Sequence, residues 1–339
     1  MNGTGKSWRI LPPAVLVAGI GLAMAGCSGG VATGSPPVSP PPSSAHTAAE
    51  QAAVMNWLAK TNQMWTSNVF AGLDQVTTGQ MRTLYQSEQQ QARPPKDADR
   101  LPFQLTGLSI TIPCHTDAAT VFVAYADTDV FDFGSSVQSV AMVFEWTGGR
   151  WKLAAAVNHS SGSGWPALCR QGTPPAARAV LAPGSYTSDL ARVLTRADSG
   201  ATQTTQTASP FAVNDFLAGP GSIPVQSAMQ IRQDRKGGVT LTGGFTPAPY
   251  PTFALPLASG NGFWIIGNLT QSDTYSAPSG VRANDWPDGN QVATPRPAVV
   301  HRETDTFTTT YTAIDPLRSD HAAVTLDGFF GWPLTAVAS

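Results

Sequence analysis

The stretch VFEWTGGRWKL, residues 143–153, decides the fold class of this chain. Its two central glycines supply the turn of a β-hairpin, because such tight turns need positive φ angles that glycine adopts without strain. In this register Trp146 lies opposite Trp151, and Glu145 lies opposite Lys152. An aromatic pair and a pair of opposite charges stabilise the same strand pairing. The stretch therefore predicts an antiparallel sheet.

Segments with a period of two residues surround this hairpin and predict further strands. They fall at residues 103–112, 121–125, 140–144 and 151–157. Before them, apolar residues at helical spacing predict a helix over residues 48–68. Thr77 and Gln80 then form the pattern of a capping box, which predicts the start of a second helix. Two helices therefore precede four strands.

The C-terminal half repeats this order of helices and strands. A helix is predicted from Ser185, and residues 211–217 and 225–235 are weaker helix candidates. Strands are predicted at residues 239–245, 252–258, 263–270, 304–314 and 322–329. Pro256 indicates a sheet edge or a bulge. We expect a long loop over residues 272–297, because Pro and Gly recur there without a period.

We therefore expect an α+β protein of two domains, each with helices packed on a curved antiparallel sheet. The chain has 339 residues, which exceeds one ordinary domain. A Thr-Pro-Pro stretch at residues 173–175 marks the boundary between a first domain, residues 47–172, and a second, residues 173–339. The second is a candidate duplicate of the first. The 32 Gly and 28 Pro exclude long coiled coils and helical bundles.

The N-terminus has the pattern of an export signal. Lys6 and Arg9 precede an uncharged run over residues 10–25, and small residues lead to Cys27. The run is too short to span a bilayer, so we expect residues 1–26 to be cleaved. Residues 27–46 are then a tether of Ser, Pro, Gly and Ala, a composition too poor in large apolar groups to fold.

Residues 22–27, LAMAGC, resemble the lipobox of bacterial lipoproteins, with Met24 at the position where Leu is usual. The resemblance implies that the Cys27 thiol is diacylated and becomes the new N-terminus. Two or three acyl chains, palmitate among them, would anchor the protein stably in the membrane. We therefore expect a lipid-anchored protein on the extracytoplasmic face of the cell membrane. An ordinary secretory signal with a chance cysteine is the alternative.

Two cysteines remain, Cys114 and Cys169, and an even number in an exported chain predicts a disulfide bond. The chain-entropy model values such a bridge at roughly 4 kcal/mol. A metal ligand or a nucleophile is the alternative reading. His115 follows Cys114, but no second Cys or His lies at ligand spacing.

Two resemblances extend this interpretation. The order of helices, sheet and aromatic hairpin over about residues 47–169 resembles the NTF2-like cone fold, which implies helices across the concave face of the sheet and often a cavity. The stretch FTPAPYPTFAL, residues 245–255, with the closing strands and the lipobox, resembles a family of actinobacterial lipoproteins of uncharacterised function. Neither resemblance implies catalytic residues.

Aromatic residues of the first half are the candidate lining of a pocket for an apolar or sugar ligand. The residues at inward positions of the predicted helices and strands are Trp57, Trp65, Tyr85, Tyr125 and Phe144. Plain core packing is the alternative explanation for the same rings.

Motifs for metals, cofactors and nucleic acids are weak. Asp127, Asp129 and Asp132 lack the Gly and the terminal Glu of a calcium loop. The five histidines form no H-x-x-x-H pair. We therefore expect neither a metal site nor a cofactor. The net charge of -2 offers no basic excess to neutralise a phosphate backbone, so we expect no nucleic-acid partner.

These patterns favour a non-enzymatic, lipid-anchored binding or scaffold protein of the cell envelope, with an envelope protein or a cell-wall ligand as partner. The first alternative is an enzyme or small-ligand binder that uses an aromatic-lined cavity, with Asp127 or Glu145 as acid or base. The second alternative is a solute-binding component of a transporter, which would need parallel sheets.

Overall fold

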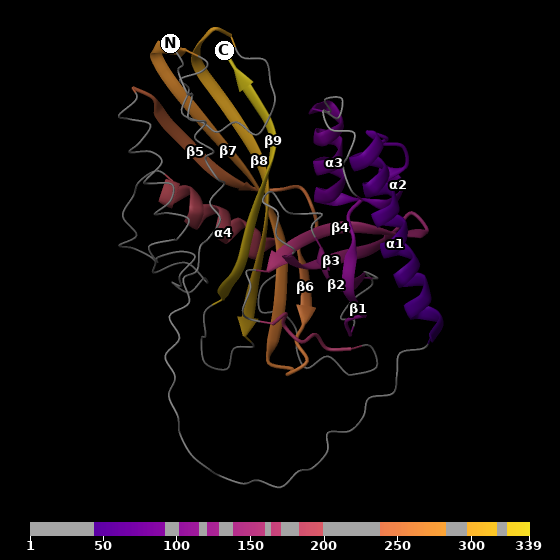
Figure 1. Ribbon diagram of the computed structural model, residues 1–339. Coiled ribbons are helices and arrows are strands. Elements are labelled where there is room, and N and C mark those ends of the chain that lie inside the picture. Colours follow the sequence, from indigo (N-terminus) through magenta and orange to yellow (C-terminus); the bar gives the residue numbers. More distant parts are fainter. Residues whose placement is uncertain are drawn as a thin grey trace, which may run out of the picture.

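The chain forms an α+β fold of helices and two antiparallel sheets, with helices packed against both sheets (Figure 1). The computed structural model describes residues 44–91, 102–114, 121–128, 138–159, 164–170, 183–198, 238–282, 297–316 and 324–339. The predicted signal peptide, Cys27 and the helix candidates at 211–217 and 225–235 lie outside these residues, as do Asp129 and Asp132.

The first sheet confirms the hairpin that the sequence predicts. Its strands follow in chain order: β1 (Leu105–Thr111), β2 (Val121–Thr128), β3 (Gln138–Thr147) and β4 (Arg150–His159). Trp146 pairs with Trp151, and Glu145 pairs with Lys152. The two turn glycines have φ angles of 60° and 77°, which explains why glycine occupies both positions.

Three helices cover one face of this sheet. They are α1 (Ser44–Ser67), α2 (Leu73–Val76) and α3 (Gly79–Gln91). The first begins inside the predicted tether and includes its last three residues, 44–46. The predicted capping box is wrong, because the Thr77 hydroxyl donates to the Leu73 carbonyl at 2.6 Å and the Gln80 amide oxygen accepts from Thr310. The Thr77 side chain thus bonds the C-terminal end of α2, and the Gln80 side chain bonds the second sheet.

In the second sheet, β7, β8 and β9 are longer than the sequence predicts, whereas β6 is shorter than the predicted strand at 252–258. They are β5 (Thr240–Pro247), β6 (Phe253–Pro256), β7 (Gly262–Arg282), β8 (Val299–Pro316) and β9 (Thr325–Ala338). The order is β5-β7-β8-β9, and β6 also pairs with β7. The predicted loop is wrong over residues 272–282, which continue β7. Polar residues alternate with buried ones there, so apolar periodicity alone did not reveal the strand.

Helix α4 (Pro183–Asp198) confirms the helix predicted from Ser185 and covers the second sheet. Its Tyr186, Leu190 and Leu194 are buried against apolar residues of that sheet. The Thr195 hydroxyl donates to the Phe245 carbonyl at 3.0 Å and accepts from the Phe245 amide at 2.7 Å. This pair of bonds occupies backbone groups of an edge strand that could otherwise pair with another chain.

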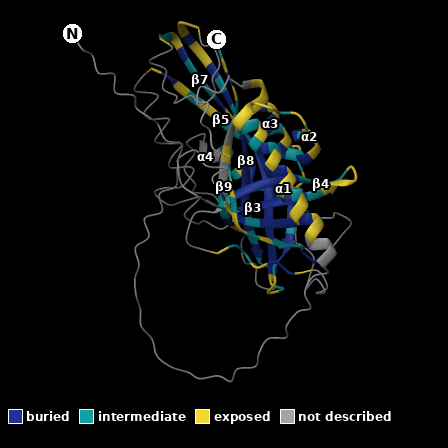
Figure 2. Cartoon of the chain, turned by 45° about the vertical axis from the view of Figure 1, so that its right-hand side comes forward, coloured by how far each residue is buried: buried dark blue, intermediate teal, exposed yellow. Residues whose placement is uncertain are grey.

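The two sheets pack face to face. Val121, Val123 and Val143 of the first sheet share one apolar layer with Trp264 and Ile266 of the second. The order of layers is therefore α1 to α3, first sheet, second sheet and α4, with the buried strands at the centre (Figure 2). Both halves of the chain contribute to this central layer.

The distal part of the second sheet extends beyond the first sheet (Figure 1). We name it the arm: strand β5 with residues 270–282 of β7, 299–308 of β8 and 332–338 of β9. Val239, Tyr275, Ala277 and Val300 form a small apolar cluster on one of its faces. The arm thus has a packed face and an opposite face.

Candidate functional site

Three of the predicted pocket residues lie in the core between the helices and the first sheet. Trp57, Tyr85 and Phe144 are buried there. The Trp57 indole donates to the Tyr85 hydroxyl at 3.1 Å, and the hydroxyls of Thr61 and Tyr85 lie 3.1 Å apart. Burial raises the pKa of Tyr85 to about 12. The polar groups of Trp57, Thr61 and Tyr85 are therefore hydrogen-bonded to one another.

The other two predicted pocket residues lie elsewhere. The half-buried ring of Trp65 has its centroid 5.0 Å from that of Phe103. Tyr125 lies on the opposite face of the first sheet, toward the second sheet, with its ring centroid 5.6 Å from that of Trp165. The structure therefore brings Trp57, Tyr85 and Phe144 into one cluster and leaves Trp65 and Tyr125 outside it.

Tyr125 belongs instead to an aromatic cluster between the sheets. The Trp165 ring lies 5.8 Å from the Trp264 ring, measured between centroids. The Tyr125 hydroxyl and the Trp264 indole nitrogen are both buried without a hydrogen-bond partner. Burial also raises the pKa of Tyr125 above its ordinary value. Trp264 could not be assigned to this cluster from the sequence, because it lies on a strand of the other half.

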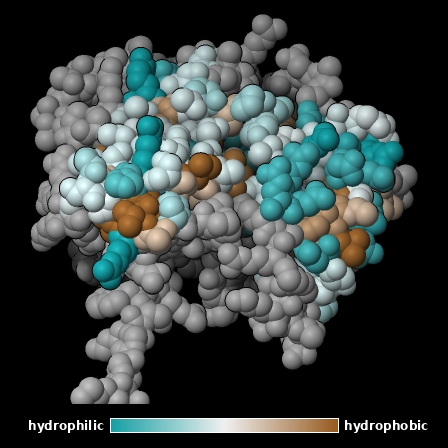
Figure 3. Space-filling model, turned by 90° about the horizontal axis from the view of Figure 1, so that it is seen from above, coloured by the Kyte–Doolittle hydropathy of each residue, from teal (hydrophilic) through white to brown (hydrophobic). Residues whose placement is uncertain are grey.

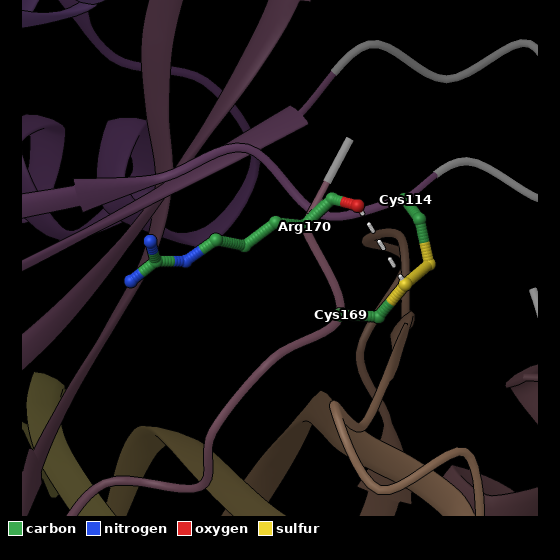
Figure 4. The surroundings of a disulfide bond; sticks show 3 residues. All are labelled: Cys114, Cys169 and Arg170. Carbon is green, nitrogen blue, oxygen red and sulfur yellow. Dashed lines mark hydrogen bonds between the residues drawn. A yellow bond between two sulfur atoms is a disulfide. The ribbon is translucent and has the colours of Figure 1, made fainter. Parts of the chain in front are cut away.

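The predicted disulfide between Cys114 and Cys169 is present, and it lies at the junction of the two sheets (Figure 4). The Cys114 amide donates to the Cys169 carbonyl at 3.0 Å. On its other side, the Cys169 amide donates to the Pro256 carbonyl at 2.8 Å, next to a bridge between Leu168 and Leu257. Residues 164–170 therefore connect the edge of the first sheet to β6 of the second.

The candidate acid and base residues of the first half are far apart. Asp127 pairs with Ser139 at one end of β2, whereas Glu145 pairs with Val121 at the other end. A separation of six strand residues corresponds to about 20 Å. Burial raises the pKa of Glu145 above its ordinary value. These two carboxyl groups cannot act on one substrate atom together.

Carboxylates also line the packed face of the arm. Asp273 pairs with Asp305 across β7 and β8, and Glu303 is fully buried in the neighbouring row. The Gln271 amide donates to the Asp273 carboxylate at 2.8 Å, and a Cβ at Gly243 would collide with that carboxylate. Within the described ranges, no group of three or more His, Cys, Asp and Glu residues has the arrangement of a metal site.

The opposite face of the arm carries Ser and Thr hydroxyls in rows across the strands. Paired residues of an antiparallel sheet share a face, so the strand register defines these rows. The rows, written from β5 to β9, are Thr240–Ser276–Arg302, Thr242–Thr274–Thr304–Val337, Gly244–Ser272–Thr306–Thr335 and Thr246–Thr270–Thr308–Trp332. We name this surface the hydroxyl face. Arg302, at the distal end, is the charged side chain of these rows.

Most side chains of the hydroxyl face are exposed or half-buried. Thr240 and Thr242 donate to carbonyls of β7 at 3.2 and 3.4 Å, and the hydroxyls of Thr274 and Thr304 lie 3.1 Å apart. Seen from above, strongly hydrophilic residues cover much of the right-hand part of Figure 3, whereas at the left pale residues lie beside a few strongly hydrophilic and a few hydrophobic ones. The rows are mostly uncharged and polar, with Arg302 as a charged side chain and Val337 as an exposed apolar one.

The hydroxyl face ends where α3 crosses the second sheet. There the Thr310 hydroxyl donates to the Gln80 amide oxygen at 2.6 Å and lies 3.2 Å from the Asn268 amide oxygen. The hydroxyls of Thr83 and Tyr250 lie 2.6 Å apart. Gln80 and Thr83 form a polar stripe of α3, whereas its apolar residues pack on the first sheet. Helix α3 therefore holds the two sheets together.

Sequence reasoning missed the hydroxyl face, although a signal for it exists. Thr occupies every second position from 304 to 312, which is the period of a strand. The alternation places Thr on one face and Asp305, Phe307, Thr309 and Tyr311 on the other, so it does not separate polar from apolar residues. The odd positions include Asp305, so a hydrophobicity pattern does not reveal the two faces.

Comparison of this chain with protein-family models, with curated protein sequences and with solved structures finds no match. Within the described ranges, no helix is both long enough and apolar enough to cross a membrane.

Proposed function

We propose that this chain is a lipid-anchored binding protein of the cell envelope and that its hydroxyl face binds an uncharged cell-wall polysaccharide. The observation that carries the proposal is the hydroxyl face itself, in which Ser and Thr residues of β5, β7, β8 and β9 are aligned in rows and Arg302 is the charged side chain. The lipobox-like LAMAGC stretch and the disulfide support a location outside the cytoplasm.

The chemistry of the face fits a polymer of sugars. A hydroxyl donates one hydrogen bond and accepts two, as a sugar hydroxyl does, so each can replace the water bound to the other. Neighbouring strands lie about 4.7–4.9 Å apart, which gives a regular array of such groups. Each hydrogen bond between a Thr or Ser hydroxyl and a sugar hydroxyl contributes little to the binding free energy, because it replaces hydrogen bonds that both groups made to water. Many contacts along one polymer, however, add up through effective concentration.

The absence of carboxylates and lysines from the rows favours a neutral polymer over a charged one. An anionic polymer would need several cations, and Arg302 is the cation that the described rows offer. Charge on about 25–35% of surface residues, with both signs interspersed, is what keeps a designed domain soluble. An exposed sheet face of this size without alternating charges therefore indicates a surface with a purpose beyond solubility.

The finer fold assignments belong to the same proposal. The packing of α1 to α3 on one face of the first sheet supports the NTF2-like fold for the first half. The order of α4 followed by β5 to β9 supports a duplicated arrangement. Lipidation of Cys27 remains a proposal on the sequence pattern.

The test is co-sedimentation of the soluble chain, residues 28–339, with purified insoluble cell-wall polysaccharide. The variant Ser272→Lys/Thr306→Lys places two cations in the middle row of the hydroxyl face. We expect it to bind roughly tenfold more weakly, the effect of about 1.4 kcal/mol. Ser109→Lys, at an exposed serine of β1, is the matched control and should bind as the parent does. Equal binding of all three proteins would contradict the proposal.

A small-ligand site is the second candidate, supported by the aromatic cluster between the sheets. The Tyr125 hydroxyl and the Trp264 indole are buried donors without partners, each of which costs about 1–3 kcal/mol. A ligand with acceptor oxygens would satisfy both. The test is a thermal-shift screen with soluble sugars: a hit that Trp264→Phe abolishes supports this site, and a hit that the variant retains contradicts it.

A further inference from the structure

The tip of the β3–β4 hairpin exposes an indole ring. Trp146 is 48% exposed, and the other exposed large apolar side chains within the described residues are aliphatic: Met55, Val69, Val299 and Val337. A Trp side chain has a large apolar surface together with one donor, which is the combination that suits the boundary between water and lipid.

The ring is held in place by its neighbours. Trp151 packs edge-on against Trp146 with 5.3 Å between the ring centroids, and Trp151 in turn packs edge-on against the buried Phe122 at 4.8 Å. The tight glycine turn follows directly after Thr147. The exposed indole is therefore fixed on a rigid hairpin that reaches into the core, so a contact made there costs little conformational entropy.

The tip of the hairpin carries two cations, Arg150 and Lys152. Arg150 is exposed, and its guanidinium lies 3.4 Å from the Gln75 amide oxygen. Lys152 donates to the Asp74 carbonyl at 3.1 Å and pairs with Glu145 across the strands. By the strand register, Arg150 pairs with Thr147 and lies on the opposite face of the hairpin from Trp146. A tip that enters the headgroup region end-on would therefore present an indole on one face and a guanidinium on the other, groups suited to the interface and to anionic lipid.

The position of the tip agrees with a membrane contact. In both Figure 1 and Figure 2 the β3–β4 hairpin projects from the right-hand side, and α1 begins lower down on the same side. The predicted lipid would be attached at Cys27, 17 residues before the first helical residue, Ser44. A random coil of this length has a mean span of about 20–25 Å. A lipid at Cys27 would therefore hold the folded part of the chain near the headgroups.

We infer that Trp146 and Arg150 at the tip of the β3–β4 hairpin form a second membrane contact, which inserts into the phospholipid headgroup region and orients the anchored protein. The inference rests on the lipid anchor of the proposed function. One indole and one guanidinium bind a bilayer weakly, but a short tether raises the local lipid concentration into the millimolar range. A contact with a dissociation constant of about 1 mM is then occupied about half of the time.

The experiment uses the lipidated full-length protein in vesicles of phosphatidylcholine and phosphatidylglycerol whose acyl chains carry bromine near the headgroup. Bromine quenches indole fluorescence only at close range. We expect the difference in emission between the parent and Trp146→Phe to be smaller in brominated than in ordinary vesicles. Trp264→Phe, which removes a fully buried indole, is the matched control and should show the same difference in both vesicles. Arg150→Gln should reduce the quenching of Trp146 by roughly twofold to fivefold, the loss of about 1 kcal/mol for one basic residue.

Two outcomes overturn the inference, and they differ from failure of the proposed function. Equal emission differences for Trp146→Phe in both vesicles would show that the indole stays in water. If wall polysaccharide changed the emission of Trp146 in the absence of vesicles, the tip would bind sugar and not lipid. Mass spectrometry of the N-terminal peptide tests the anchor separately, and an unmodified Cys27 would contradict both the anchor and this inference. Loss of polysaccharide binding alone would leave the vesicle result unchanged.

Discussion

The first sheet and the arm of the second sheet are built from strands of similar length, yet they are covered differently. In the first sheet, Phe122 faces the helices and Val123 faces the second sheet, and both are fully buried. In the arm, Asp305 is buried on one face, whereas its neighbour Thr306 is half-exposed on the other. The first sheet thus serves stability on both faces, and the arm has one face available for binding.

This difference predicts where substitutions matter. In a layer packed on both sides, a lost side chain leaves a cavity that neighbours cannot fill. On a solvated face, water replaces the lost group. Stability and binding should therefore be separable, with the largest losses of stability in the first sheet and the largest losses of binding in the arm.

The largest expected effect is that of Phe122→Ala. The Phe122 ring stacks on that of Phe144 with 4.7 Å between centroids and is fully buried. We expect the free energy of unfolding in urea to fall by about 3–5 kcal/mol. Thr274→Ala in the arm is the comparison, with an expected change of about 0.5 kcal/mol or less. Similar losses for the two variants would contradict the contrast between the layers.

The disulfide comes next, because it connects the two sheets. The double variant Cys114→Ser/Cys169→Ser removes a bridge between residues separated by 55 positions and should destabilise the protein by about 2–4 kcal/mol. The largest increase in the rate of amide hydrogen exchange should occur at residue 169 and at Ala258, whose amides donate hydrogen bonds across the junction. Increased exchange confined to the arm would instead place the connection elsewhere.

Tyr85→Phe should have a smaller effect, and one that depends on pH. The variant leaves the Trp57 indole without its acceptor, at a cost of about 1–3 kcal/mol. In the parent, burial raises the pKa of Tyr85 to about 12, whereas the unfolded chain ionises this phenol near pH 10. Its stabilisation is therefore complete below pH 10 and is lost between pH 10 and about 12.

Urea denaturation from pH 8 to 11.5 measures this dependence. The free energy of unfolding should decrease less steeply above pH 10 in Tyr85→Phe than in the parent protein. Identical slopes would show that the Tyr85 phenol ionises equally in the folded and unfolded states, which its burial argues against.

The smallest effect on stability is expected for Ser272→Lys/Thr306→Lys. Both side chains project from the hydroxyl face, so a charged group there stays in water. We expect the free energy of unfolding to change by about 0.5 kcal/mol or less. A loss above about 2 kcal/mol would show that the face is covered in the folded protein.

The sequence reveals the apolar strands and the hairpin because local patterns encode them. The pairing of Trp146 with Trp151 follows from a two-residue turn, and the helix that carries Leu190 follows from its spacing. The packing of Val123 against Trp264 joins residues 141 positions apart, and no local period encodes such a contact. The division of the predicted pocket residues between the two faces of the first sheet depends on the same long-range packing.

The sequence did not predict all of the arm, for a different reason. Residues 272–282 contain Ser, Thr, Pro and Gly, a composition typical of loops, yet they pair with β8 over most of their length. Strand pairing stabilises this segment although its residues have low strand propensity, because β7 lies between two strands that hydrogen-bond its backbone. The buried Asp273 and Asp305 also conceal the period, since carboxylates usually indicate the exposed face.

The most direct test of the account removes hydroxyls from the arm while keeping its shape. Thr242, Thr274 and Thr304 form one row across three strands, and Val has nearly the same size as Thr. We predict that the free energy of unfolding of Thr242→Val/Thr274→Val/Thr304→Val lies within about 1 kcal/mol of that of the parent. The same variant should no longer co-sediment with cell-wall polysaccharide. Full retention of polysaccharide binding by this variant would contradict the account, because the hydroxyls could not then be the groups that bind.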